Sequence, residues 1–247
     1  SVVGLREIEP SIAALQNMPL MFRNWEEVDY VREKMRPAME KKFLDKGFVV
    51  LAWGDAGWVR FFSKKGALRP EDYKTARFFA WGGESEQQEI MKRLGYTPVP
   101  LETSDILPSI QTGMIDAVPC TPYFALATQI YTSAPNMLDL NWAPIVGALV
   151  ITRKAWDEMT PEGQQRLREA GATVGAQIRA QARKEVDEAV DAMKKRGLTV
   201  NTPNAAQIKE WQALAEALYP QIRGKLVPAE TFDEVLAHLK AYRAGKP

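Results

Sequence analysis

The side chains best suited to bind a ligand lie near the ends of expected strands. Arg60 follows a glycine turn within an apolar stretch, and arginine in such a setting is seldom unpaired. Its planar guanidinium can hold a carboxylate through two parallel hydrogen bonds. Aromatic and charged residues gather around the same strand ends, namely Trp53, Asp55, Trp58, Arg77, Phe79, Trp81, Tyr123 and Trp142. Packing in a core is the simpler interpretation for any single aromatic residue. Taken together, the cluster predicts an aromatic pocket for a small anion, since ligands bind beyond strand ends in open α/β sheets.

Motifs for catalysis, metals and cofactors are missing from the sequence. The chain has one cysteine, Cys120, and one histidine, His238, which excludes an intrachain disulfide, CxxC sites and histidine-rich metal sites. Cys120 lies in a short apolar stretch, which is typical of a small buried side chain, and His238 lies on the last expected helix. No GxxxxGKS/T, GxGxxG or GxSxG motif occurs. We therefore expect no cofactor, no metal ion and no catalytic residue.

The overall composition excludes several classes of protein. The 247 residues are 46% hydrophobic and 26% charged, with a formal net charge of +1. A chain of this length and composition can bury a substantial core. Near-neutral charge gives no reason to expect nucleic acid or an anionic membrane as partner. No apolar run approaches the ~20 residues that a membrane span needs, and the first ten residues show no signal-peptide pattern.

Expected strands and helices alternate along the chain, as in α/β proteins. Asn24 with Glu27 predicts a capping box for a helix over 25–46, and we expect Pro37 to kink or divide that helix. The apolar run 48–53 predicts a buried strand that the following WGDAGW segment ends. Further strands are expected at 59–63, 76–81, 97–100, 114–118 and 144–152.

Polar residues and proline mark the starts of the short helices between these strands. Ser85 with Gln88 predicts a second capping box. Ser104 is expected to cap the next helix, and Thr121 followed by Pro122 gives an N-cap with proline at the first helical position. These helices follow the strands that carry the candidate binding residues.

The longest expected helix begins at Thr160-Pro161 and ends near Arg196, before Gly197. One apolar stripe follows it, formed by Leu167, Val174, Ile178, Val186, Val190 and Met193. About 36 helical residues extend ~54 Å, which exceeds the ~30 Å of a small domain. We therefore expect this helix to lie across two packed bodies. A strand at 198–201 and helices at 204–219 and 228–243 are expected to complete the chain.

Four stretches of the chain form a distinctive series. They are Gly57-Trp-Val-Arg60-Phe-Phe-Ser-Lys64 with Pro70-Glu-Asp72, Leu94-Gly95-Tyr-Thr-Pro98-Val-Pro100, Ser104-Asp105-Ile-Leu-Pro-Ser-Ile-Gln111-Thr-Gly113-Met-Ile-Asp116, and Ala148-Leu-Val-Ile-Thr152 followed by Trp156 and Thr160-Pro161-Glu162. In this order and spacing they resemble the substrate-binding proteins of TRAP transporters, a family of periplasmic dicarboxylate receptors. The third stretch is the most specific, and the resemblance covers nearly all of the chain.

This resemblance implies a two-lobed α/β fold of the periplasmic-binding-protein type, with a long helix that spans both lobes. Lobe I is expected at 1–55 and 143–200, and lobe II at 56–142. Residues 201–247 are expected to form C-terminal helices that pack across the two lobes.

The resemblance also implies a periplasmic receptor that delivers its ligand to a TRAP-type membrane permease. The ligand of the family is a small organic acid, held in the cleft between the lobes. Closure has a physical basis, because a buried carboxylate is costly unless arginine and other donors meet it. A ligand favours the closed state only to the extent that it binds that state better.

The ligand-contacting positions of the family map onto particular residues of this chain. Arg60 matches the first ligand-facing arginine. Phe79 stands where the family has its principal carboxylate-binding arginine, and Arg77 lies two residues earlier, where it can face the cleft because alternate strand residues share a face. The other implied positions are Asp105, Cys120 with Thr121, and Trp142 as the opposite wall. The departure at Phe79 indicates an aromatic-rich pocket for an acid that is larger or less charged than a simple dicarboxylate.

The start of the chain also departs from the family pattern. Family members have a signal peptide and a strand–helix–strand–helix segment before the position that matches Ser1-Val2-Val3-Gly4. We therefore expect that the sequence starts within the first lobe, and that the segment that precedes it in the family carries further ligand contacts.

Three other interpretations remain open at this stage. An enzyme on the same scaffold would use Arg60, Asp55 or Asp105 on a bound acid, and it would consume its ligand. A sensor would present its ligand-bound form to a signalling partner instead of a permease, and the sequence does not separate it from a transport receptor. An interaction module without a small ligand leaves the cluster of arginine and tryptophan residues unexplained.

Overall fold

The computed structural model describes residues 2–245, which divide into two units. Unit 1 contains the chain up to Ala56, Ala143–Lys184 and the part from Arg223 onward. Unit 2 contains Gly57–Trp142 and Glu185–Ile222. The chain therefore passes between the units four times, and each passage is a single stretch of backbone without an intervening linker.

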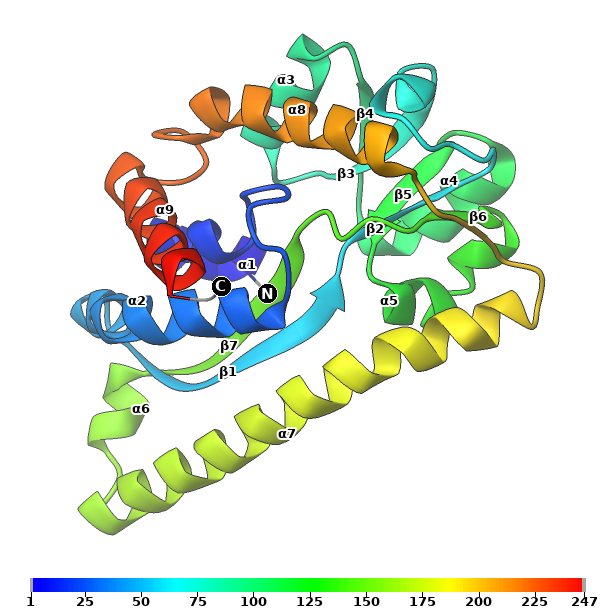
Figure 1. The fold of residues 1–247 in the computed structure, drawn as a ribbon. Coiled ribbons are helices and arrows are strands. Elements are labelled where there is room, and N and C mark those ends of the chain that lie inside the picture. The colour runs from blue at the N-terminus through cyan, green and yellow to red at the C-terminus, as the bar shows by residue number, and fades with distance from the viewer. Residues whose placement is uncertain (1, 246–247) are drawn as a thin grey trace. The chain divides into compact units, whose positions relative to one another are not determined.

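Unit 1 combines a two-stranded sheet with most of the long helices (Figure 1). Its elements are α1 (Val2–Ile8), the 3-10 helix η1 (Pro10–Leu15), α2 (Trp25–Asp45), most of β1 (Phe48–Trp58), β7 (Pro144–Thr152), α6 (Arg153–Asp157), the larger part of α7 (Pro161–Lys194) and α9 (Ala229–Ala244). Strands β1 and β7 pair with each other.

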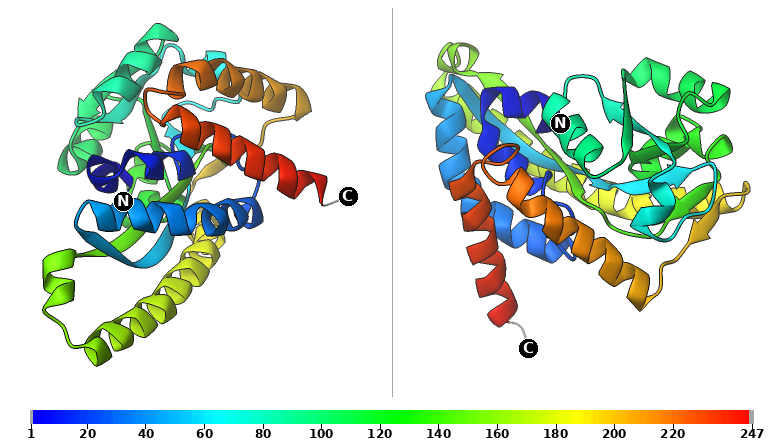
Figure 2. Two further views of the ribbon diagram at one scale, coloured as in Figure 1. Left: turned by 90° about the vertical axis from the view of Figure 1, so that its left-hand side faces the viewer. Right: turned by 90° about the horizontal axis from the view of Figure 1, so that it is seen from above.

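Helices α2 and α9 of unit 1 pack against each other, and Figure 2 shows them side by side. The rings of Tyr30 and Tyr242 lie 4.8 Å apart between centroids. Arg243 of α9 donates from Nε and Nη2 to the buried carboxylate of Glu27, each at 2.8 Å. This ion pair ties the end of the chain to the first turn of α2.

Helix α7 approaches β1 closely through glycine. A Cβ added at Gly171 would overlap with the carbonyl oxygen of Leu51, and one at Gly175 would lie 3.1 Å from both the Trp53 oxygen and the Ala52 Cβ. Because the two glycines are four residues apart, they face the strand from one side of the helix. Their small size sets the distance between helix and strand.

Unit 2 is built on a six-stranded sheet with the strand order β4-β3-β5-β2-β6-β8. The strands are β2 (Arg60–Ser63), β3 (Arg77–Trp81), β4 (Thr97–Leu101), β5 (Ala117–Cys120), β6 (Asn136–Leu138) and β8 (Thr199–Asn201). Its helices are η2 (Pro70–Tyr73), α3 (Ser85–Arg93), η3 (Thr103–Asp105), α4 (Ile106–Thr112), α5 (Pro122–Ala127), η4 (Ile130–Thr132), the end of α7 and α8 (Ala205–Ile222). Strand β2 runs antiparallel to β5 and β6, so it is opposite in direction to the other five strands.

The two faces of this sheet bury different side chains, since neighbours in a strand point to opposite faces. On one face, Phe62 and Phe79 belong to an apolar core that also contains Ile110, Val118 and Met193. On the other face, aromatic rings gather around α8, with centroid distances of 5.4 to 6.0 Å between Phe61, Tyr73, Phe78, Trp142 and Trp211. In each adjacent pair of phenylalanines, 61–62 and 78–79, one ring thus packs in the aromatic layer and the other in the apolar core.

Several expected elements are confirmed. Asn24 caps α2 and accepts a hydrogen bond from the Glu27 amide at 2.9 Å, although the Glu27 carboxylate accepts from the Arg23 amide instead of closing a capping box with Asn24. Thr121 caps α5, with Pro122 at its first position. Strand β7 has the expected bounds, and α7 is one continuous helix from Pro161 to Lys194.

Other local expectations are wrong. WGDAGW does not end β1, which continues to Trp58 and pairs with the distant strand β7, a partner that the local turn preference of its glycines does not reveal. Pro37 lies inside α2, which is one unbroken helix. The N-cap of α3 is Glu84 instead of Ser85, and Gln88 donates to the Trp81 carbonyl at 2.7 Å instead of closing a capping box.

The expected starts of α4 and β5 are also corrected. Ser104 lies in the 3-10 turn before α4, whose N-cap is Asp105 without a side-chain hydrogen bond. The strand expected at 114–118 runs over Ala117–Cys120. The shift places Cys120 at the end of the strand.

The apolar stripe of α7 is buried in its C-terminal half alone. Val186 and Met193 are buried, whereas Val174 and Ile178 are 43% and 47% exposed. Periodicity identifies residues that share a helix face, and it carries no information on whether another element covers that face. Within residues 2–245, no helix has both the length and the apolar composition that crossing a membrane requires.

Candidate functional site

One edge of the sheet in unit 2 collects most of the candidate binding residues. We define the strand-end edge as the edge at which β3, β4, β5, β6 and β8 end and β2 begins. The chain passes from β3 through α3 to β4 on one side, and then through α4 to β5 on the other side of β3. The carboxyl ends of β3 and β5 therefore flank a topological switch point, where open α/β sheets bind ligands.

Arg60 lies at this edge as the first residue of β2. It shares a sheet face with Phe62, and the register places it opposite Cys120 of β5. Its side chain is 14% exposed, and Nη1 donates to Oδ1 of Asp139. The Nε atom is buried and has no hydrogen-bond partner within the described residues. The guanidinium therefore has donor capacity that Asp139 does not use.

Asp139 follows directly on Leu138, the last residue of β6, which pairs with Phe61. Its amide donates to the Asn201 carbonyl at 2.9 Å, so its backbone is held by β8 as well as by the β2–β6 pair. Asp139 was missed by the sequence analysis, because β6 has only three residues and gives no strand pattern. Recognising Met137-Leu138 as a strand end would have placed it beside Arg60.

The end of β5 adds small and uncharged side chains. Cys120 is buried, and burial raises the pKa of its thiol well above the usual value, so it stays protonated. Thr121 accepts a hydrogen bond from the Phe124 amide at 3.4 Å as the cap of α5. Gly57 has φ +108° and lies 3.5 Å, measured from its added Cβ, from the Thr121 side chain. Only glycine adopts this conformation without strain.

The other candidates near this edge have varied surroundings. Trp81 ends β3, and its ring meets Phe79 edge-on at 4.8 Å. Asp105 follows β4 and is exposed, with a hydrogen bond from Ser104 Oγ at 3.3 Å. Tyr123 is 51% exposed on α5. Trp58 is buried just before β2.

Three candidates in unit 2 lie away from the edge. Arg77 begins β3 at the opposite edge, where Nε and Nη2 donate to Asp116 at 2.8 and 3.0 Å. Phe79 is buried in the apolar core. The ring of Trp142 packs edge-on against both Phe61 and Trp211 in the aromatic layer on the other face.

Two candidates belong to unit 1. The indole of Trp53 donates to Glu40 Oε1 at 2.9 Å. Asp55 has a fully buried side chain and accepts from Arg32 Nη1 at 2.6 Å and from Arg183 Nη2 at 2.7 Å. Both arginines also bond to Asp29.

This cluster, which we call the Asp55 cluster (Asp29, Arg32, Asp55 and Arg183), has two positive and two negative charges. Burial by itself raises the pKa of Asp29, but hydrogen bonds from Arg183 and the nearby arginine charges outweigh burial, so the pKa lies below its usual value. The Arg183 guanidinium also lies 4.7 Å from the Trp25 ring centroid. With every charge compensated inside unit 1, the cluster is built to hold elements together.

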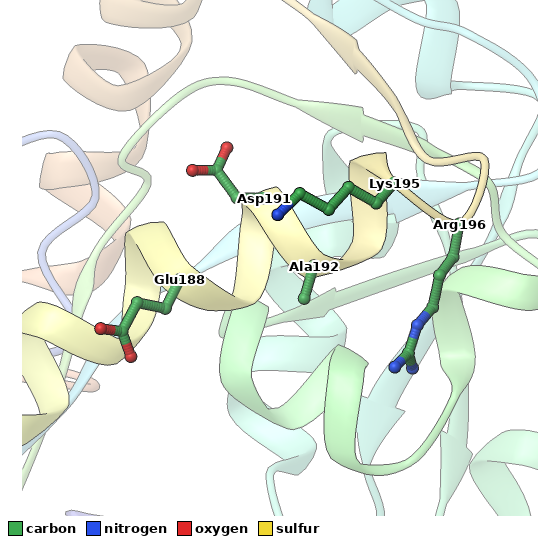
Figure 3. Close-up of a pocket in the computed structure, with 5 residues that line it drawn as sticks. All are labelled: Glu188, Asp191, Ala192, Lys195 and Arg196. Carbon is green, nitrogen blue, oxygen red and sulfur yellow. The ribbon is translucent and has the colours of Figure 1, made fainter.

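A separate surface pocket of about 410 Å³ lies at the end of α7 in unit 2. Figure 3 shows its lining residues, of which Glu188, Asp191 and Ala192 lie on the last turns of α7, and Lys195 and Arg196 lie in the turn that follows it. Asp191 and Lys195 extend along the same side, while Glu188 and Arg196 point away from them. Charges of both signs around this open pocket give no preference for an anion. In the described part of the chain, no cluster of three or more His, Cys, Asp or Glu residues could hold a metal ion.

The strand-end edge thus places Arg60 beside the carboxyl end of β5, next to the switch point, on a fold of alternating strands and helices. Residues 1–225 match the model of the bacterial extracellular solute-binding proteins, family 7. The chain belongs to this family. The match covers most of the chain, from the first residue to the end of α8.

One curated relative is the C4-dicarboxylate-binding periplasmic protein DctP of Rhodobacter capsulatus. It is 21% identical over 223 residues, which are 90% of this chain and 66% of the relative. The chain spans about two thirds or less of the length of the curated relatives it matches.

Two solved structures have the same fold at low sequence identity. A TRAP periplasmic solute-binding protein of Xanthobacter autotrophicus Py2 with bound β-D-galacturonate has a TM-score of 0.84 and 20% identity, over 96% of this chain and 77% of that one. Another, of Ralstonia eutropha H16 with bound (S)-2-acetolactate, has a TM-score of 0.88 and 18% identity, over 98% and 78%. These similarities confirm the expected two-lobed α/β fold and the resemblance to TRAP solute-binding proteins. The expected long helix is α7, which contributes to both units.

Proposed function

We propose that this chain is an extracytoplasmic solute receptor that binds a small organic acid at the strand-end edge of unit 2. The observation that carries the proposal is Arg60, a largely buried arginine beside the carboxyl end of β5, whose Nε has no hydrogen-bond partner among the described residues. A guanidinium in this position is suited to a ligand carboxylate. Membership of family 7 supports the receptor function, and the ligands named for the three related proteins all carry a carboxylate.

Binding without turnover is part of the same proposal. Cys120 is buried and its thiol is kept protonated, so it is a poor nucleophile. His238 lies in unit 1 beside Glu234, outside the strand-end edge. A receptor releases the ligand unchanged, whereas an enzyme on the same scaffold converts it.

The direct test is native mass spectrometry of the purified chain, followed by denaturing release of any bound small molecule. An organic acid that is recovered intact, and that raises the melting temperature when added back, supports the proposal. Recovery of a chemically altered acid after incubation favours an enzyme. A protein that carries no acid and is stabilised by none in a broad panel contradicts the proposal.

Delivery to a TRAP-type permease and a periplasmic location complete the proposed function. The test is uptake of the labelled acid by membrane vesicles that contain the permease from the same genome. Addition of the loaded receptor is expected to stimulate uptake, and addition of receptor with Arg60→Ala is not. Equal uptake with and without receptor would favour a sensor.

A further inference from the structure

We propose that Asp139 makes the strand-end edge selective for acids with one carboxylate and a neighbouring hydroxyl or amino group, and that it disfavours simple dicarboxylates. This inference rests on the proposed function, because it concerns which acid Arg60 receives. It follows from the charges at the edge and from the way Asp139 is held.

The strand-end edge is rich in carboxylates. The segments that directly follow the five parallel strands are 82–84, 102–105, 121, 139–143 and 202–204. These segments contain Glu84, Glu102, Asp105 and Asp139 and no lysine or arginine. Among the described residues of these segments and the first residue of β2, Arg60 is the one with a positively charged side chain. The carboxylate of Asp139 is bonded to the Arg60 guanidinium, and a negative charge already beside the arginine favours a ligand of low negative charge.

Asp139 already shares the guanidinium of Arg60. The two residues lie on one sheet face, because each is two positions from a core residue that faces the same way, Phe62 for Arg60 and Met137 for Asp139. The Asp139 amide is bonded to Asn201 at 2.9 Å. This bond fixes the backbone of Asp139 beside Arg60, so its carboxylate stays within side-chain reach of the guanidinium when a ligand arrives.

Arg60 and Asp139 favour different groups on the ligand, because Arg60 donates hydrogen bonds and Asp139 accepts them. Arg60 keeps N–H donors for one carboxylate. The side chain of Asp139 is 39% exposed, and an ionised carboxylate only accepts hydrogen bonds. A hydroxyl or ammonium group beside the ligand carboxylate can donate to it. A second carboxylate in that place would meet a like charge, which is the repulsive element that selectivity requires.

The neighbouring side chains provide no compensating charge. Cys120 lies opposite Arg60 in the β2–β5 register and is uncharged. The Thr121 hydroxyl oxygen is engaged as the cap of α5. Arg77, two residues before Phe79, is held by Asp116 at the other edge. Within unit 2, Asp139 is thus the residue whose charge decides between the two ligand classes.

The experiment is isothermal titration of the full chain with two sets of acids, each set of similar carbon number. The three- and four-carbon set is lactate, propionate, malate and succinate, and the six-carbon set is gluconate, hexanoate, glucarate and adipate. We expect the hydroxylated monoacid of the better-fitting set to bind at least about tenfold more tightly than the unsubstituted dicarboxylate of that set. Alanine in the short set shows whether an ammonium group can replace the hydroxyl.

The variant Asp139→Asn removes the charge and keeps the shape. We expect it to weaken binding of the hydroxylated monoacid and to strengthen binding of the dicarboxylate, so that their ratio falls about tenfold. Asp139→Ala serves as a second variant if the amide disturbs the fold, and circular dichroism checks both. Asp116→Asn is the matched control, because it also removes an arginine-paired aspartate from unit 2 and is expected to leave the ratio unchanged.

The outcomes separate this inference from the proposed function. Tighter binding of succinate or adipate by the wild-type chain overturns the inference and leaves the receptor function intact. Equal changes for both ligand classes in Asp139→Asn also overturn it, since they show a structural role for Asp139. Failure of every acid to bind overturns both the inference and the proposed function.

Discussion

Arg183 of α7 holds the carboxylate of Asp55 in β1, with Nε at 3.1 Å and Nη2 at 2.7 Å from Oδ2. Both residues lie beside the positions where the chain leaves unit 1, after Ala56 in β1 and after Lys184 in α7. On the unit 2 side of the same two passages, Gly57 lies against Val186, with 3.1 Å between its added Cβ and Cγ2. Strand β1 and helix α7 thus contact each other within each unit, immediately next to the positions where they pass from one unit to the other.

Removal of the Asp55 carboxylate is expected to destabilise the protein strongly. In Asp55→Ala, the Arg32 and Arg183 charges lose their buried counter-charge, and loss of one partner of a buried ion pair costs about 3–5 kcal/mol. Urea unfolding measures the change in the free energy of unfolding. The control Asp157→Ala removes an exposed partner of Arg153, for which a change below about 0.5 kcal/mol is expected. Similar changes in both variants would contradict a structural role for the Asp55 cluster.

Gly171→Ala is expected to destabilise unit 1, although alanine favours helices. Its Cβ would overlap with the Leu51 carbonyl oxygen, and such overpacking costs about 1–3 kcal/mol. Gly4→Ala in α1 is the control, since nothing lies within 4 Å of its added Cβ. We expect that change to stabilise by about 0.5–1 kcal/mol. Thermal unfolding of the two variants measures both effects, and a stabilising Gly171→Ala would show that α7 does not depend on its close approach to β1.

The sequence predicts elements whose signals are local. The cap at Asn24 and the Thr121-Pro122 helix start depend on residues within three positions of each other, and both are found as expected. The length of β1 is not predictable in this way. Its glycines favour a turn, whereas its strand partner β7 begins only at Pro144, and the arginines that bind Asp55 are 23 and 128 residues away.

The same limit applies to the candidate site. Composition and strand ends identify Arg60, and the resemblance places it at a ligand position. Its partner Asp139 lies 79 residues away, after a three-residue strand. Arg77 and Asp116 are 39 residues apart, so that pair is equally invisible to local patterns. Residue types therefore indicate which side chains can bind an anion, while the fold decides which of them already have a counter-charge.

Glu27 is expected to make stability depend on acid pH. Burial raises the pKa of its carboxyl, but hydrogen bonds from Arg243 and the Arg23 amide outweigh burial, so the pKa lies below its usual value of 4.5. A carboxyl with a lowered pKa in the folded state stabilises the protein above the unfolded-state pKa. That stability is lost as the pH falls below about 4.5 and through the lower folded-state pKa.

Glu27→Gln is therefore expected to lower the free energy of unfolding by about 2 kcal/mol at neutral pH. Between pH 5 and pH 3, the free energy of unfolding of the variant should decrease less steeply than that of the wild-type protein. Urea unfolding at each pH measures this difference. Glu162→Gln, at an exposed pair with Arg166, should follow the wild-type curve. If the free energy of unfolding of Glu27→Gln decreases as steeply below pH 5 as that of the wild-type protein, other carboxyl groups cause the loss of stability in acid.

Cys120 is expected to resist alkylation in the folded protein. Burial raises the pKa of its thiol, and the thiolate is the reactive form. Mass spectrometry after treatment with iodoacetamide at about pH 8, near the pKa of a free thiol, should show an unmodified chain, and full modification in guanidinium chloride. Rapid modification of the folded protein would indicate an accessible thiolate at the strand-end edge and would reopen the question of a nucleophile.

The account of binding depends most directly on Arg60. The geometry favours it over Arg77, whose guanidinium is bonded to Asp116 at the other edge. The decisive measurement is the affinity of Arg60→Ala and Arg77→Ala for the acid released from the purified protein, by isothermal titration beside the wild type. We expect Arg60→Ala to lose at least about thirtyfold, or roughly 2 kcal/mol, and Arg77→Ala to stay within about threefold. Wild-type affinity in Arg60→Ala, or a larger loss in Arg77→Ala, would contradict binding of the acid at the strand-end edge.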